Sequence, residues 1–265
     1  MSLKSFSVSR GCFLAGAVPI AIGTVAAFAG LVGTASASII YQDNFTGGTA
    51  NLDGAAPTID HGASTVWTAG GTNGPGNGAG AGVGWQDNGS TSFSGNSGSA
   101  YLLFKPSIGN IYTLAGGLDV ASGNWMSIGF VKSPVTTNPL YGSGAYAWAL
   151  MTPGGGAAEY PGPDQTNAGV GFTGTSGTNT ISIVLDTMAT QWTYQVFDNG
   201  TSVAPAASFA TNQPTITAVG FGNSDSTGTV SGFELSSAAV PEPASLGLAA
   251  VGAMGLLLLK RRKAV

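Results

Sequence analysis

TISIVLD at positions 180–186 and QWTYQVFDNG at positions 191–200 are the two stretches that decide the fold class. In both, apolar and polar side chains alternate with a period near two, which is typical of a half-buried β-strand. Asp198-Asn199-Gly200 ends the second stretch, and this sequence readily adopts the positive φ angles of a tight hairpin turn. We therefore predict a strand at 180–186 and the first arm of a hairpin at 191–197.

Short runs of the same kind recur along the chain, separated by Gly, Asn, Asp, Ser and Pro. Glycine accounts for 43 of 265 residues, far above the usual level of about 7%, and no long helical stripe occurs between 38 and 239. Many short strands with frequent turns are typical of a sandwich or barrel. We predict an all-β fold, an antiparallel β-sandwich over residues 38–239. The remaining expected strands are 39–45, 64–68, 100–105, 111–120, 125–132, 145–151, 169–172, 215–221 and 229–235.

The charge of this segment excludes several classes of function. Residues 38–239 contain eleven acidic residues and two basic ones, Lys105 and Lys132, and so carry a net charge of about −9. Phosphate groups attract Lys and Arg, so we predict no nucleic-acid binding and little attraction to anionic lipid. The single cysteine, Cys12, lies ahead of this segment. The segment therefore has no disulfide, thiol nucleophile or Cys-based zinc site.

The N-terminal segment has the three parts of a secretory signal: a basic flank, a long apolar run and the small-x-small sequence Ala35-Ser36-Ala37. This order predicts a signal peptide at 1–37 with cleavage before Ser38. The length of the apolar run leaves an uncleaved anchor open as the alternative.

The C-terminal segment, 240–265, also has three parts. Val240-Pro241-Glu242-Pro243 comes first, and its prolines exclude a continuing helix. Residues 244–259 carry no charge and would span about 24 Å as a helix, short of a hydrocarbon core of about 30 Å. Lys260-Arg261-Arg262-Lys263 then forms a basic membrane stop. Basic residues stay cytoplasmic, so the body is expected to lie outside the membrane.

These three parts together resemble the PEP-CTERM sorting signal. The resemblance implies export and recognition by an exosortase, a membrane cysteine protease-transpeptidase, at Val240, Pro241, Glu242 and Pro243. It also implies a transient stay of the C-terminal helix in the cytoplasmic membrane of a Gram-negative bacterium. Display at the cell surface or in an exopolysaccharide matrix would follow.

The body between the two ends resembles the concanavalin A-like (laminin-G-like) jelly rolls. The stretches that carry the resemblance are 43–45, 52–54, 100–104, 112–114, 125–130 and 184–187, with Trp67 and Trp192. The resemblance implies two antiparallel sheets and, in many relatives, glycan binding.

Catalytic motifs of known classes are absent from the body. Retaining glucanases of this fold use two carboxylates from one strand, in a Glu-x-Asp-x-x-Glu pattern, and neither Glu159 nor Glu234, the two glutamates of the body, belongs to such a pattern. His61, the only histidine, lies in a polar turn without a Gly-x-Ser-x-Gly elbow. We predict that the protein is not an enzyme and needs no cofactor.

Two kinds of ligand remain open. Calcium prefers oxygen ligands, and several aspartates lie in turn-like settings without the spacing of a known calcium loop: Asp43, Asp53, Asp60, Asp87, Asp164 and Asp225. For glycans, the candidate stacking residues are Trp85 and Tyr160, because both adjoin loops. The other tryptophans lie in strand-like runs and are expected in the core: Trp67, Trp125, Trp148 and Trp192.

The sequence thus predicts an exported, exosortase-sorted, non-catalytic protein of the cell surface or extracellular matrix, with weak binding of exopolysaccharide as an open function. Its partners would be the secretion machinery, the exosortase and, before processing, the membrane. The alternatives are a carbohydrate-active hydrolase with an unrecognised site and a purely structural or adhesive protein.

Overall fold

A computed structural model describes residues 37–46, 51–63, 66–71, 74–75, 85–87, 91–94, 97–136, 140, 144–162 and 170–239. These residues form antiparallel strands and one short 3-10 helix, η2 (Pro153–Gly155). The predicted signal helix and C-terminal helix fall outside the described residues. Among those described, no helix has the length and apolar character that a membrane crossing requires.

The strands, in chain order, are β1 (Ala37–Asp43), β2 (Ile59–Asp60), β3 (Thr68–Gly71), β4 (Gly74–Pro75), β5 (Gln86–Asp87), β6 (Thr91–Ser94), β7 (Gly98–Leu103), β8 (Asn110–Val131), β9 (Ala145–Met151), β10 (Gly156–Tyr160), β11 (Gly171–Thr173), β12 (Asn179–Asp186), β13 (Thr193–Asp198), β14 (Thr201–Ser202), β15 (Ala207–Ser208) and β16 (Ala218–Ala239).

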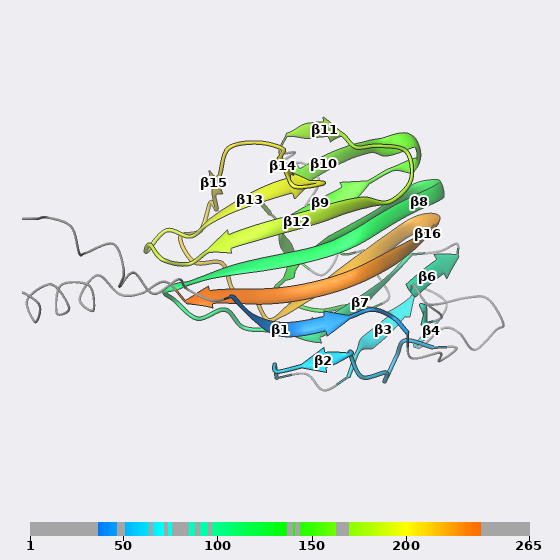
Figure 1. Cartoon of the computed structure of the whole chain (residues 1–265), viewed down its shortest axis with the longest axis horizontal. Coiled ribbons are helices and arrows are strands. Elements are labelled where there is room, and N and C mark those ends of the chain that lie inside the picture. The colour runs from blue at the N-terminus through cyan, green and yellow to red at the C-terminus, as the bar shows by residue number, and fades with distance from the viewer. Residues whose placement is uncertain are drawn as a thin grey trace, which may run out of the picture. The chain divides into compact units, whose positions relative to one another are not determined.

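Two long strands, β8 and β16, organise the domain and lie side by side (Figure 1). Both bend near the middle, where Gly123 faces Ser226. Gly123 has a φ of +91°, and a Cβ there would lie 2.2 Å from the carbonyl oxygen of Asp225. Glycine tolerates both the positive φ and the close backbone approach. Each long strand therefore runs out along one sheet, bends, and returns along a second sheet.

The bend divides the ladder into two layers. The first sheet has the order β2, β1, the C-terminal part of β16, the N-terminal part of β8, β12 and β13, with β14 and β15 paired to β13. The second sheet has the order β11, β10, β9, the C-terminal part of β8, the N-terminal part of β16, β7, β3 and β4. The short β6, with β5 beside it, pairs with β16 next to its bend.

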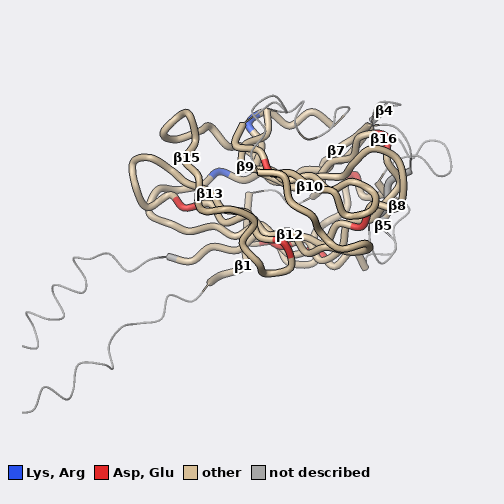
Figure 2. The backbone as a smooth tube through the Cα atoms, turned by 90° about the horizontal axis from the view of Figure 1, so that it is seen from above, with Lys and Arg blue, Asp and Glu red and all other residues tan. Residues whose placement is uncertain are grey.

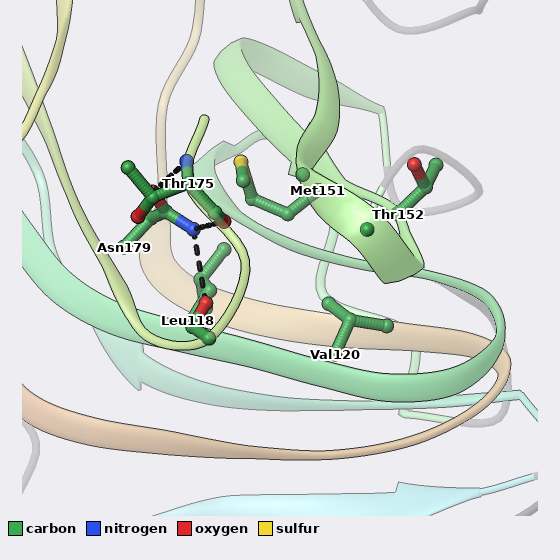
Figure 3. Close-up of a pocket in the computed structure, with 9 residues that line it drawn as sticks. Leu118, Val120, Met151, Thr152, Thr175 and Asn179 are labelled. Atoms are coloured by element: carbon green, nitrogen blue, oxygen red, sulfur yellow. Dashed lines mark hydrogen bonds between the residues drawn. The ribbon is translucent and has the colours of Figure 1, made fainter. Parts of the chain in front are cut away.

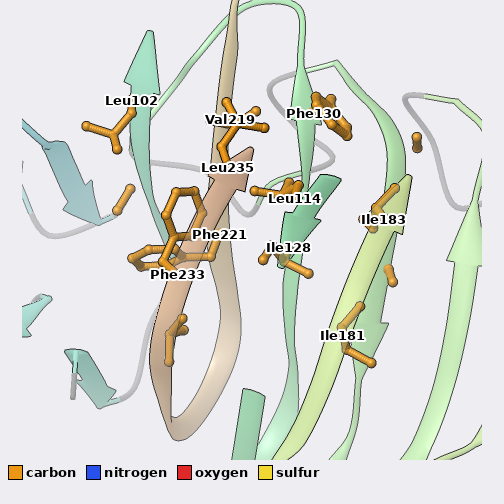
Figure 4. Close-up of a cluster of buried hydrophobic side chains, with 14 of the residues drawn as sticks. Leu102, Leu114, Ile128, Phe130, Ile181, Ile183, Val219, Phe221, Phe233 and Leu235 are labelled. Atoms are coloured by element: carbon orange, nitrogen blue, oxygen red, sulfur yellow. The ribbon is translucent and has the colours of Figure 1, made fainter. Parts of the chain in front are cut away.

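The core lies between the two sheets, as Figure 4 shows for side chains such as Ile181 and Ile183 from the first sheet and Ile128 and Phe130 from the second. In β12, every second residue is buried, which is the pattern of a sheet with one face on the core. In β9, almost all residues are buried. A second cluster that includes Trp148 and Leu150 explains this, because it covers the other face of the second sheet.

The predicted all-β fold, an antiparallel β-sandwich, is confirmed by the strand pairing. Strand 145–151 has the predicted bounds, and the predicted hairpin forms between β13 and β14. Its turn has φ values of +49° at Asn199 and +77° at Gly200, as an Asn-Gly turn requires. The prediction was wrong where it divided β8 and β16 into two strands each, because the ladder between them continues around the bend.

Candidate functional site

The two predicted sugar-stacking residues are buried. Trp85 is 2% exposed and packs edge-on against Phe221, with ring centroids 4.8 Å apart. Tyr160 is 8% exposed and stacks on Trp148 at 4.3 Å and 17°. Stacking on a sugar requires a ring face open to solvent, and neither residue offers one. The prediction of glycan contacts at Trp85 and Tyr160 therefore does not agree with the structure.

The remaining tryptophans are largely where the sequence places them. Trp67, Trp148 and Trp192 belong to the buried core. Trp125 is only partly buried and packs against the second cluster, 6.0 Å from Trp148.

The predicted processing residues lie mostly outside the described part of the chain. Ala35, Val240, Pro241, Glu242, Pro243 and the basic residues Lys260, Arg261, Arg262 and Lys263 are all outside it. Ala37 and Ser38 are the first two residues of β1, paired with Ala238 and Ser237. Cleavage before Ser38 would leave six of the seven residues of β1 in the domain.

The candidate calcium ligands do not form a cluster among the described residues. No group of three or more His, Cys, Asp or Glu side chains occurs in the part of the chain that the structure describes. Asp43 is instead 3% exposed and accepts hydrogen bonds from Nε1 of Trp67 at 2.6 Å and from the amide of Phe45 at 2.8 Å. Asp164 and the side chain of Asp87 lie outside the description.

His61 is exposed in a bend after β2, and its backbone amide donates to the carbonyl of Ile40 at 2.8 Å. This is the surface setting that the sequence indicates for it.

Glu159 is the most deeply buried glutamate that the structure describes. It lies on β10, is 4% exposed, and shares a face with Ala149, its partner on β9. Burial raises the pKa of its carboxyl group above the ordinary value, because a low-dielectric surrounding disfavours the charged form. Burial, and then the charge of Glu159, also raise the pKa of Tyr194 on the opposite sheet. The charge of Glu159 therefore acts on Tyr194 across the sandwich.

The raised pKa of Glu159 predicts a pH-dependent stability. Between the ordinary pKa and the higher value in the fold, the folded protein binds more protons than the unfolded chain. The free energy of unfolding contributed by this group therefore falls as the pH rises through that window. We expect Glu159→Gln, which is neutral at every pH, to gain stability relative to the native protein as the pH rises above the ordinary glutamate pKa of 4.5. Urea unfolding at several pH values measures this, with Glu234→Gln as a control for losing one negative charge. Parallel pH profiles for native protein and Glu159→Gln would contradict the expectation.

A cleft of about 410 Å³, here called the hairpin cleft, lies at the edge of the sandwich and is lined by several polar side chains. It lies between β11 and the β13–β14 hairpin. Its lining residues are Phe172, Thr173, Thr175, Asp198, Asn199, Thr201, Ser202 and Val203. A volume of this size falls in the range of small-molecule sites.

Asp198 is the chemically distinctive residue of the hairpin cleft. Its Oδ1 atom is buried and has no hydrogen-bond partner, and partial burial raises the pKa of the carboxyl group. A buried acceptor without a partner is costly. Ligand hydroxyl groups are donors that would satisfy it. The exposed hydroxyls of Thr173 and Thr201 lie in the same lining.

A network around Asn179 holds the wall of the cleft in place. Asn179 is 1% exposed, and its Oδ1 accepts from the amide of Thr175 at 2.8 Å and from Nδ2 of Asn199 at 3.1 Å. Its Nδ2 donates to the carbonyl of Thr175 at 2.8 Å. Figure 3 shows Asn179 and Thr175 beside a second, enclosed cavity of about 10 Å³ that Leu118 and Met151 also line. That cavity has room for about one water molecule. This small cavity is therefore a packing void, and the hairpin cleft is the candidate site.

Sequence reasoning places Asp198 only at the tip of a turn and does not identify the hairpin cleft. The cleft forms because β12 crosses from the loop after β11 to β13, which brings Phe172 and Asp198 to the same edge. No local sequence pattern predicts that Phe172 and Asp198 lie at the same edge of the sandwich.

The chain was compared with curated protein sequences, solved structures and protein families. Curated protein sequences give no match. Among solved structures, the chain is similar to an endo-1,3-beta-glucanase from Streptomyces sioyaensis, with 11% identity and a TM-score of 0.47 over 77% of this chain and 97% of that chain. It is also similar to the carbohydrate recognition domain of Emp46p in its potassium-bound form, with 8% identity and a TM-score of 0.43 over 59% of this chain and 85% of that chain.

The family comparison identifies the C-terminal segment. Residues 239–263 match the family described as the PEP-CTERM protein-sorting motif. This agrees with the resemblance of the Pro-Glu-Pro sequence, the apolar stretch and the basic cluster. The chain therefore carries a PEP-CTERM protein-sorting motif at its C-terminus, the mark of an exported protein.

Proposed function

We propose that this chain is a non-catalytic protein of the cell surface or extracellular matrix of a Gram-negative bacterium, released from the membrane by an exosortase. In this proposal its concanavalin A-like jelly roll binds a glycan of an exopolysaccharide matrix in the hairpin cleft.

The sorting motif is the observation that carries the proposal. Its match begins at Ala239, which is also the last residue of β16. The last described strand therefore ends where the sorting motif begins, an order that suits a displayed domain followed by a processing segment. Residues 38–239 carry a net negative charge. This agrees with a surface that attracts neither nucleic acid nor anionic lipid.

Glycan binding is supported by the chemistry of the hairpin cleft. Sugars offer many hydroxyl donors, and Asp198 offers a buried acceptor without a partner. The partly exposed ring of Phe172 lies in the same lining and can contact the apolar face of a sugar. The Asn179 network fixes the wall before a ligand arrives, which reduces the entropic cost of binding.

A glycan array of the processed protein tests this function, run with and without calcium. We expect binding to at least one acidic or neutral polysaccharide fragment. Asp198→Asn should weaken it by about 10-fold to 100-fold, because a hydrogen bond to a charged group contributes about 1.5–3 kcal/mol. The matched control is Asp225→Asn, at an exposed turn aspartate at the bend of β16, which should bind as the native protein does.

Two results would contradict the proposal. Equal binding by Asp198→Asn and the native protein would remove the hairpin cleft as the site. Release of reducing ends from any polysaccharide would contradict the non-catalytic part.

A carbohydrate-active hydrolase is the second candidate, because Glu159 has the raised pKa of a general acid. Such a mechanism needs a second carboxylate, at about 5 Å in retaining enzymes and about 6.5–9.5 Å in inverting ones, and a route for substrate to a side chain that is 4% exposed. Hydrolysis that Glu159→Gln abolishes would favour this candidate. The absence of both binding and hydrolysis across the array would favour a purely structural or adhesive protein.

A further inference from the structure

Both ends of the described chain leave the sandwich at one end, here called the exit end. Ala37, which begins β1, pairs with Ala238, and Ala239, which ends β16, pairs with Asn110 at the start of β8. Because β8 and β16 bend and return, their other ends, Val131 and Ala218, pair with each other. The exit end therefore includes strand ends from both sheets and the loops at 104–109, 132–136 and 187–192 (Figure 1).

Three of the exposed large apolar side chains that the structure describes, Leu103, Ile108 and Met188, lie at the exit end. Ile108 is 65% exposed and Met188 is 40% exposed. Their loops are joined through Thr187, whose hydroxyl donates to the carbonyl of Ser107 at 2.8 Å and to that of Asn110 at 2.8 Å. Ile108 and Met188 thus belong to one connected surface next to Ala239. Leu103, which is 53% exposed, is the last residue of β7 and pairs with Ala218 at the same end.

Charged residues of both signs lie at the exit end. Lys105 and Lys132, the two basic residues of the body, both lie in exit-end loops and are exposed. The hydrogen bonds of Thr217 link these loops, because its amide nitrogen and hydroxyl bond to Val131 and Lys132 and its carbonyl accepts from Phe104. Asp119, Asp198 and Asp225 lie toward the bend at the opposite end, whereas Asp186 lies at the exit end, where it pairs with Ile111 and accepts a hydrogen bond from the amide of Met188 at 2.8 Å. In Figure 2 the two basic positions lie in the half of the domain where β1 begins, and an acidic position lies in that half as well.

The chain outside the description limits how far the exit end can be from a membrane. The apolar stretch begins at Ala244, five residues beyond the last residue of β16. Five extended residues span at most about 17 Å. Once residues 244–259 are inserted in a membrane, the exit end is therefore held within the thickness of the headgroup region and its first water layers.

We propose that, before processing, the exit end rests on the lipid–water interface of the membrane, with Ile108 and Met188 inserted among the lipid headgroups. This rests on the proposed function, because the C-terminal segment must first be inserted. Apolar side chains gain from leaving water at that depth, and Lys105 and Lys132 face the lipid phosphates. The domain thereby holds a fixed orientation, with the hairpin cleft at the opposite end and directed away from the membrane.

Fluorescent labelling of the full chain in zwitterionic phosphatidylcholine vesicles tests this proposal. In a Cys12→Ser background, an environment-sensitive NBD label is attached at Ile108→Cys or Met188→Cys. The matched control is Ser176→Cys, an exposed position in the loop before β12, at the opposite end of the sandwich. Vesicles hold about one chain each, and flotation of the vesicles reports insertion of the C-terminal segment.

The expected result is a blue-shifted emission at 108 and 188 that a lipid-borne spin label quenches, with neither change at 176. Floating chains whose labels at 108 and 176 behave alike would overturn the proposal and leave the sorting function intact. Chains that fail to float would overturn both. A blue shift that the lipid-borne quencher does not affect would indicate contact with a second copy and would also overturn it. Hydrogen exchange of the unlabelled chain provides a second measurement, with slower exchange at 104–109 and 187–190 expected on vesicles.

Discussion

Replacing Trp67 by alanine is expected to lower the free energy of unfolding by about 3–5 kcal/mol, the usual cost of removing a buried aromatic ring. Trp67 is 1% exposed and contacts Phe221 and Phe233, with ring centroids 5.1 Å and 5.0 Å away. These two residues come from the two halves of β16, so the indole packs against both sheets at once. Its Nε1 also donates to the buried Asp43. The variant would therefore leave both a cavity and a buried carboxylate oxygen without its partner.

Urea unfolding followed by circular dichroism measures this effect. The adjacent residue Val66 is 40% exposed, so Val66→Ala is a matched control and should change the stability by less than about 0.5 kcal/mol. A loss below about 1 kcal/mol for Trp67→Ala would mean that this residue does not join the two sheets.

Gly220→Ala is expected to destabilise the second sheet by more than about 3 kcal/mol, at the upper end of what overpacking costs. Gly220 lies in β16 between Tyr101 of β7 and Gly129 of β8. A Cβ added there would lie 2.0 Å from the backbone carbonyl oxygen of Ala100. A flexible side chain could move away, but a strand backbone fixed by its ladder cannot, so the strands must separate.

Thermal unfolding of the purified variant measures this loss. Gly171→Ala is the matched control, because it also replaces a strand glycine of the second sheet, while its Cβ would meet only the carbonyl oxygen of Ala157 at 3.8 Å. An ordinary van der Waals contact of this kind should leave the stability nearly unchanged. Similar melting temperatures for the two variants would contradict the strand register described for β7 and β16.

The sequence predicts most of the sandwich because its strands carry local signals. The alternation at 180–186 matches β12, in which the odd-numbered residues are buried. Asn199-Gly200 predicts its hairpin, because few other dipeptides adopt two consecutive positive φ angles easily. β10 is missed because Gly156-Ala157-Ala158 has neither alternation nor β-branched residues, and its pairing with β9 and β11 defines it.

Long-range packing accounts for the other differences. The sequence 121–124 reads as a turn, yet β8 continues through it, since β16 bends at the same place and keeps the pairing. Trp85 and Tyr160 adjoin loops in the sequence, but they are buried by Phe221 and Trp148, which are distant in the chain. The hairpin cleft depends on the same kind of contact between distant segments. Local patterns therefore predict the strands, whereas the site depends on which strand edges meet.

Intact mass spectrometry of the exported protein, purified from cells that contain an exosortase, tests the central claim most directly. We expect a mature chain that begins at Ser38 and has lost the apolar stretch and basic cluster beyond Pro243, so that the β-sandwich remains as the displayed product. A mature chain that still contains residues 244–265 would contradict it, because the C-terminal segment would then be a permanent membrane anchor.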